Sequence, residues 1–174
     1  LCLMSASPAS AQDLDPRAYA HVPVDATFLV WGFGVSEGGI VSDPTLPVTN
    51  LQATVLTPSL GAGRSFNLFG RTAQAFVVLP YSFAQIAGKA FGVAGSTDRE
   101  GISDMRMRVS WLVRGAPAAA IGQIVKAPRR TIIGTSLNFA APTGEYYPDK
   151  LLNLGTNRWS VRPEFAVSQP IGQR

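Results

Sequence analysis

A period-two alternation of apolar and polar residues is the feature that most constrains how this sequence can fold. The pattern is clearest in residues 104–114, where every odd position carries an apolar side chain. Arg106, Arg108 and Ser110 occupy even positions of the same segment. Because successive side chains of a β-strand point to opposite faces, this segment predicts a strand with one apolar face and one basic face.

The same alternation recurs along the chain. In residues 159–169 the polar positions include Arg162 and Glu164, and in residues 131–141 they include Ser136 and Asn138. Three further segments also alternate, although Phe76 and Val78 weaken the pattern in residues 71–80, and two polar residues and a proline dilute it in residues 49–59. The sequence therefore predicts an all-β, antiparallel fold with six strands of about ten residues. They are expected at residues 25–36, 49–59, 71–80, 104–114, 131–141 and 159–169.

Composition restricts the class of protein further. Only 15% of the residues are charged and 46% are hydrophobic, whereas a soluble domain has about 25% charged residues. This apolar content excludes a disordered chain, and no uninterrupted apolar run has the roughly 18 residues of a membrane-spanning helix. A single cysteine excludes both a disulfide framework and a multi-thiolate metal site.

Two architectures fit alternating strands of this kind. In a soluble β-sandwich the apolar side chains face a core, whereas in a transmembrane β-barrel they face lipid and the polar side chains line a lumen. The polar positions here use Gly, Ser, Asn and a few Arg, with almost no Lys or Glu, which favours the barrel. Trp31, Trp111 and Trp159 all fall on apolar faces, where interfacial aromatic residues of a membrane protein are expected.

The first eleven residues have the character of a secretion signal. Ala9, Ser10 and Ala11 form an A-x-A cleavage site before Gln12, after a short apolar stretch. The basic region that begins a signal peptide is missing, so residues 1–11 are interpreted as a signal peptide truncated at its start. Residues 12–174 are then expected to form one exported domain.

Several phrases of the sequence resemble a known family. In order and spacing they are similar to the MetA-pathway of phenol degradation family, a group of proposed outer-membrane transporters. The resemblance extends from about residue 16 to the end of the chain, and NLGTNRW is its most specific phrase. The phrases are RSFNLFGR at 64–71, LPY at 79–81, GISD at 101–104, GAPA at 115–118, APTGEY at 141–146, NLGTNRW at 153–159 and RPE at 162–164.

The resemblance implies an up-and-down transmembrane β-barrel in the bacterial outer membrane that passes or binds small, often aromatic, solutes. It carries over no catalytic residue and no cofactor. Such barrels continue well beyond this length, so residues 12–174 are predicted to be an N-terminal part of one barrel. Because single-chain barrels have at least about eight strands, six strands alone are expected to form a curved, open sheet.

Connector lengths predict the orientation of the strands. With a periplasmic N-terminus, the long connectors at residues 36–47, 82–103 and 142–158 are external. The connectors at residues 61–70 and 115–128 are then periplasmic, and residues 116–124 are expected to form a short helix.

Charged residues on the polar faces are the candidate site. A lumen lined by arginines would favour anions, although the same residues could instead form an internal salt-bridged plug with Glu164 and Asp104. Arg64, Arg71 and Arg114 lie near strand ends, at the expected rim. The predicted lumen-lining residues are Arg106, Arg108, Ser110, Ser136, Asn138, Arg162 and Glu164.

Other chemistry has little support in the sequence. His21 is the only histidine, and the acidic pairs lack the spacing of a calcium loop. Arg129 and Arg130 form the only basic doublet, so a nucleic-acid surface is not expected. No nucleophile and base are paired, so we do not predict an enzyme. Two functions remain: an outer-membrane channel or transporter in contact with lipid, for small aromatic or anionic solutes, and a secreted soluble β-sandwich or lipocalin-like binding module.

Overall fold

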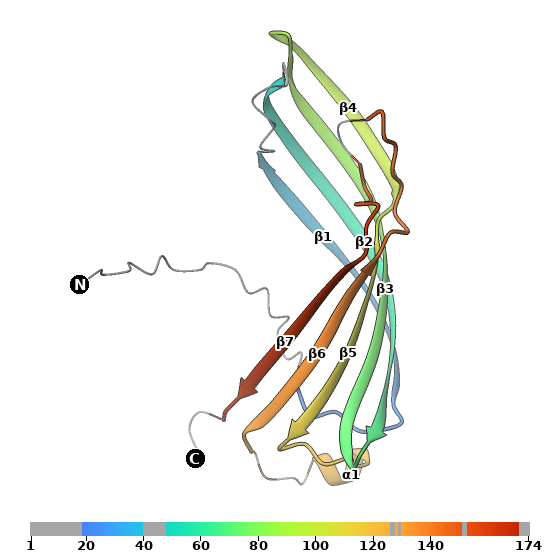
Figure 1. Cartoon of the computed structure of the whole chain (residues 1–174), viewed down its shortest axis with the longest axis vertical. Coiled ribbons are helices and arrows are strands. Elements are labelled where there is room, and N and C mark those ends of the chain that lie inside the picture. The colour runs from blue at the N-terminus through green and yellow to red at the C-terminus, as the bar shows by residue number, and fades with distance from the viewer. Residues whose placement is uncertain (1–18, 40–47, 126–127, 129, 151–152, 171–174) are drawn as a thin grey trace, which may run out of the picture.

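One antiparallel β-sheet makes up almost the whole fold (Figure 1). The computed structural model describes residues 19–39, 48–125, 128, 130–150 and 153–170, so the predicted signal peptide lies outside the described residues. The sheet order is β1-β2-β3-β5-β6-β7. β4 also pairs with β3, along the part of β3 that β5 does not reach. The strands are β1 (Thr27–Gly39), β2 (Val48–Leu68), β3 (Arg71–Ala90), β4 (Val93–Ile102), β5 (Met105–Arg114), β6 (Ile132–Ala141) and β7 (Ser160–Ser168).

The predictions of an all-β fold and an antiparallel sheet are confirmed. The sheet is also open, as expected for six strand runs, because β1 and β7 lie at its two ends and are not paired with each other. β4 pairs with the second half of β3 and β5 with the first half. β4 and β5 therefore form one strand run that is interrupted at Ser103 and Asp104.

Two predicted connectors are wrong, because residues 61–70 and most of 82–103 belong to strands. β2 has 21 residues and β3 has 20, about twice the predicted length. The true turns are two residues long, Phe69-Gly70 and Phe91-Gly92, and all four residues have positive φ. This conformation matches the twist of antiparallel strands and favours Gly at the second position. Small residues made the surrounding segments resemble loops in the sequence.

The strand register aligns apolar residues of neighbouring strands in rows on one side of the sheet. Leu29 of β1 pairs with Ala62 of β2, and the row continues across β3, β5, β6 and β7 through Val77, Met107, Phe139 and Val161. We call this side the apolar face. Its exposed large side chains are Leu29, Trp31, Phe33, Val35, Leu56, Leu60, Leu79, Tyr81, Phe83, Ile102, Val109, Ile133, Leu137, Val161, Phe165 and Val167.

The opposite side, here called the polar face, carries mainly small and polar residues. One of its rows runs across β2, β3, β5, β6 and β7 and consists of Ser65, Gln74, Ser110, Ser136 and Glu164. The predicted alternation is therefore a property of the whole sheet and not only of single strands.

Little of the described chain is buried in an apolar core. The buried apolar residues are Tyr19, Ala73, Ala84, Ile86, Leu112, Ala116 and Ala141, and four of these seven are alanines. Leu112 and Ala116 pack with Tyr19 in a small cluster on the polar side. The large apolar side chains thus lie on the exposed apolar face rather than in a core.

The only described helix is α1 (Ile121–Ile124), which is shorter than the predicted span of 116–124. None of the helical structure described is long and apolar enough to cross a membrane.

The segment before β1 is tied to the end of the sheet near β5 and β6. The amides of Val24 and Asp25 donate hydrogen bonds to the carbonyl oxygens of Ala119 and Ser65. The His21 ring donates through Nε2 to the Pro117 carbonyl oxygen at 2.8 Å. Residues 19–26, here called the N-terminal strap, are thereby fixed to β2 and to the connector after β5.

Candidate functional site

The polar face of β5, β6 and β7 brings most of the predicted lumen residues together. Two adjacent rows meet there. In one, Arg108 lies opposite Asn138, which lies opposite Arg162, and in the other Ser110 lies opposite Ser136, which lies opposite Glu164. Three strands thus place these six side chains on one patch of the sheet.

Glu164 is the centre of this patch. Its Oε2 lies 3.2 Å from Nη2 of Arg108, and its Oε1 lies 3.0 Å from Nη2 of Arg162. Ser136 donates a hydrogen bond from Oγ to Oε2 at 3.2 Å. Because the Arg108 and Glu164 side chains are only 17% and 14% exposed, this ion pair is weakly screened by solvent. We call Tyr19, Arg108, Ser136, Arg162 and Glu164 the Glu164 cluster.

Tyr19 of the N-terminal strap completes the Glu164 cluster. Its hydroxyl lies 2.9 Å from Oγ of Ser136, and the guanidinium of Arg108 lies 5.0 Å from the centre of its ring, a cation–π geometry. Gly134 makes room for the ring, because a Cβ at this position would collide with Cδ1 of Tyr19. The strap is therefore held against the polar face by packing, a hydrogen bond and a cation–π contact.

The remaining predicted residues take different positions. Arg106 is exposed on the polar face next to the Glu164 cluster, and Ser110 is buried. The side-chain amide of Asn138 donates to the Arg162 carbonyl oxygen at 3.4 Å. Trp31 lies on the apolar face, where it is 70% exposed.

The other two tryptophans lie near strand ends. Trp111 packs edge-on against Phe69 of the β2–β3 turn, with the ring centres 6.2 Å apart. Trp159 directly precedes β7 and is 66% exposed.

Asp104, at the interruption between β4 and β5, anchors the connector between β6 and β7. Its Oδ1 accepts a hydrogen bond from the Gly144 amide at 3.0 Å. Its Oδ2 accepts two more from Thr156, from the amide at 2.8 Å and from Oγ1 at 2.6 Å. One carboxylate therefore joins both ends of the connector, in an arrangement that we call the Asp104 clamp.

Two glycines allow the Asp104 clamp to close. A Cβ on Gly144 would lie 2.7 Å from Cα of Gly155 and 2.8 Å from the backbone nitrogen of Asp104. A side chain at either glycine would therefore separate the two ends of the connector. These glycines belong to the phrases APTGEY and NLGTNRW, so the clamp explains why glycine stands at these two positions.

Sequence reasoning missed Tyr19 and the role of Asp104. Tyr19 precedes the first predicted strand, where no periodic pattern marks it, and the sequence marks Asp104 only as the start of a strand and a possible plug residue. Both make contacts over more than 35 positions of sequence. Among the residues that the structure describes, no group of three or more His, Cys, Asp or Glu side chains could hold a metal ion.

Replacing Glu164 with Gln should destabilise the fold. The substitution takes a carboxylate away from the largely buried Arg108 side chain. We therefore expect a loss of about 2 kcal/mol, between the ~0.5 kcal/mol of an exposed ion pair and the ~3–5 kcal/mol of a fully buried one. Urea unfolding followed by tryptophan fluorescence measures the change. Glu100→Gln, on exposed β4, is the matched control and should leave the free energy of unfolding nearly unchanged; equal effects of both variants would contradict the role of the cluster.

The Asp104 clamp should protect the connector between β6 and β7 from hydrogen exchange. Corrected for intrinsic rates, the exchange of the Gly144 and Thr156 amides should be slow, because both amides donate hydrogen bonds to the Asp104 carboxylate. Asp104→Asn should lower this protection about tenfold at pH 7, since hydrogen bonds to a charged group contribute about 1.5–3 kcal/mol. Asp98→Asn on β4 is the control, and protection in Asp104→Asn equal to that of the control would disprove the clamp.

Comparison with known proteins supplies a family. No curated protein and no solved structure shows a significant match to this chain. A family model described as "Putative MetA-pathway of phenol degradation" matches residues 32–173, which include most of β1 and all the strands from β2 to β7. The chain therefore belongs to this family.

Proposed function

We propose that this chain forms part of an outer-membrane β-barrel that passes or binds small solutes. In this proposal the apolar face contacts lipid and the polar face lines the lumen. The observation that carries it is the exposure of sixteen large apolar side chains on one face of a single-layered sheet. Soluble monomers rarely expose an apolar patch of this extent, whereas a lipid-facing surface requires one.

The height of the apolar face fits a membrane. On β3 the apolar positions run from Ala73 to Phe83, which is 11 residues, and they are bounded by Arg71 and Gln85. A tilted membrane-spanning strand needs about 9–11 residues. Gln85 belongs to a polar row of cross-strand partners that also contains Glu37, Thr54 and Asp98. β1, β2 and β3 thus leave the apolar region at the same level, and β4 leaves it one row earlier, at Glu100 opposite Phe83.

A barrel requires partners for the two end strands. Unpaired N–H and C=O groups at a sheet edge cost several kcal/mol each in lipid. The free edges of β1 and β7 would therefore pair with further strands in the membrane.

The charge of the polar face favours anionic solutes. The described strands place four arginines on this face, Arg99, Arg106, Arg108 and Arg162, against one glutamate, Glu164. Arg108 and Arg162 share Glu164, which leaves the cluster with a net positive charge beside Arg106. The family description refers to phenol degradation, which is consistent with a small aromatic solute.

The alternative, a secreted β-sandwich or lipocalin-like module, needs the large apolar side chains inside. In a sandwich a second sheet covers the apolar face of the first. Within the described part of the chain, all strands belong to one sheet, and no second sheet covers that face. The membrane proposal is the better supported of the two.

Two neighbouring residues of β1 test which face meets lipid. Phe33 lies on the apolar face and is 68% exposed, whereas Gly34 lies on the polar face with open space around its Cα. Phe33 lies two residues from Val35, whose row with Leu56 and Phe83 is the last of the apolar region. We therefore expect Phe33→Arg to cost about 1–2 kcal/mol of stability in lipid bilayers, between the midplane and interface values for arginine, and Gly34→Arg to leave stability nearly unchanged. Urea titrations of the protein folded into vesicles measure both values. A soluble protein would show no greater cost for Phe33→Arg than for Gly34→Arg, because both arginines would meet water.

The charge of the proposed lumen can be tested with Arg106. Replacing this exposed arginine by Gln removes a positive charge that has no partner in the Glu164 cluster. We expect the reversal potential in a KCl gradient across a planar bilayer to shift toward lower anion preference. Arg158→Gln, in the connector outside the strands, is the control. An unchanged reversal potential in Arg106→Gln would overturn the assignment of this face to a conducting lumen.

A further inference from the structure

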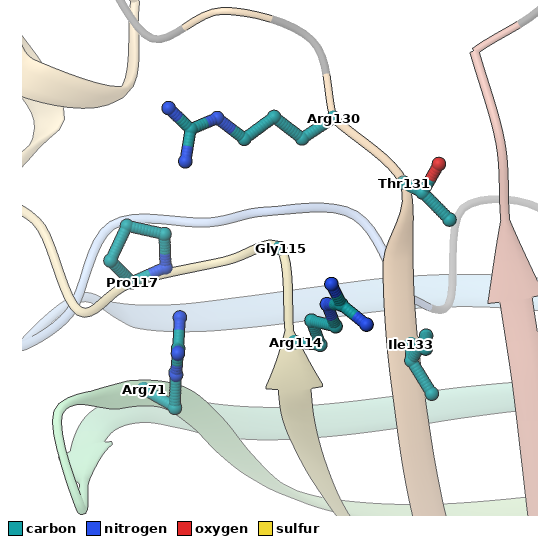
Figure 2. Close-up of a pocket in the computed structure, with 7 residues that line it drawn as sticks. All are labelled: Arg71, Arg114, Gly115, Pro117, Arg130, Thr131 and Ile133. Carbon is teal, nitrogen blue, oxygen red and sulfur yellow. The ribbon is translucent and has the colours of Figure 1, made fainter.

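Three arginines surround a hollow at the end of the sheet where the N-terminal strap is attached. The hollow has a volume of about 640 Å³. Figure 2 shows Arg71, Arg114 and Arg130 around it, together with Gly115, Pro117, Thr131 and Ile133. Volumes of about 300–1,000 Å³ are typical of sites for small ligands.

Backbone contacts fix the arginines at the hollow. Arg71 is the first residue of β3 and Arg114 is the last residue of β5. Arg71 forms a β-bridge with Pro117. Gly115 has a φ of +87°, and a Cβ there would collide with the Thr131 carbonyl group. This close approach joins the chain after β5 to the chain before β6 and so brings Arg114 near Arg130.

No carboxylate of the described residues neutralises the three positive charges at the hollow. No residue that lines the hollow is acidic. Elsewhere Arg64 is paired with Asp25, and Arg108 and Arg162 are paired with Glu164. Within the described residues, Arg71, Arg114 and Arg130 have no such carboxylate. Like charges gathered in this way repel one another, so an anion at the hollow would stabilise the arrangement.

The hollow adjoins the apolar face. Arg114 lies opposite Ile133, which is an exposed residue of that face and also lines the hollow. Arg71 shares its side of β3 with Ala73. A ligand at this place therefore meets guanidinium groups next to exposed hydrocarbon, which is the chemistry of a lipid at its headgroup.

We propose that this hollow binds the phosphate of an anionic phospholipid at the membrane boundary. The choice of a lipid rests on the proposed function, whereas the phosphate chemistry rests on the arginines alone. Guanidinium groups bind phosphate oxygens through paired hydrogen bonds. Bound in this way, the lipid anchors the end of the barrel at the level where the apolar face stops.

The test is a titration of the detergent-solubilised full chain with short-chain phosphatidylglycerol, followed by native mass spectrometry. The variant Arg71→Gln/Arg114→Gln/Arg130→Gln should bind this lipid at least tenfold more weakly than the parent. The control Lys89→Gln/Lys150→Gln/Arg158→Gln removes the same charge from residues that do not line the hollow and should change binding less than twofold. If the Gln variant does not fold, Arg→Lys at the same three positions keeps the charge and should weaken binding severalfold by losing the paired hydrogen bonds.

The outcomes separate the possible explanations. Equal binding by the parent and the Gln variant, or by the parent and the Lys variant where only that one folds, would overturn the site. Inorganic phosphate that binds as tightly as the lipid would overturn the lipid assignment and identify a free-phosphate site. Detergent dependence, measured separately as sedimentation without detergent, reports on the proposed membrane function. A protein that stays soluble there but still loses lipid binding in the Gln variant would contradict that function and not the arginine site.

Discussion

The cross-strand register is the constraint on which the rest of this structure depends. Because every pair of neighbours is antiparallel, and in phase outside the register shifts at Thr49/Gln52 and Trp111/Arg114, a residue's parity along its strand decides its side over most of the sheet. A slip of one residue between β3 and β5 would carry Arg108 to the side of Leu29 and mix the two faces. The single layer, the scarcity of buried apolar residues and the concentration of arginines on the polar face all follow from this register.

Long-range contacts of a few polar residues complete the sheet at its interruptions. The Glu164 cluster holds the N-terminal strap on the polar face through Tyr19. The Asp104 clamp folds the β6–β7 connector onto the break between β4 and β5. In each case one carboxylate accepts several hydrogen bonds or pairs with guanidinium groups. These contacts stabilise a negative charge at a partly buried position. In the proposed barrel, a strap on the polar face would narrow the lumen on that side.

Sequence alone predicts the parts of this fold that depend on local alternation. The six strand runs, the antiparallel all-β class and the open sheet are set by a period that can be counted in residues such as 104–114. The extended halves of β2 and β3 were missed because Gly, Ser and Thr on a polar face resemble a loop, while the Phe-Gly turns are only two residues long. The seven predicted lumen residues do share one face, but the sequence does not reveal that Arg108 and Arg162 converge on Glu164. Tyr19 and the partners of Asp104 depend on contacts between distant segments, and no local pattern encodes them.

The most direct measurement is the quenching of Trp31 by lipids that carry bromine on their acyl chains. A variant with Trp111→Phe and Trp159→Phe leaves Trp31, which is 70% exposed on the apolar face, as the single tryptophan. If that face contacts lipid, brominated lipids in vesicles will quench its fluorescence strongly and aqueous iodide will not. Strong quenching by iodide together with no effect of the brominated lipids would contradict the account, because it would place the apolar face in water.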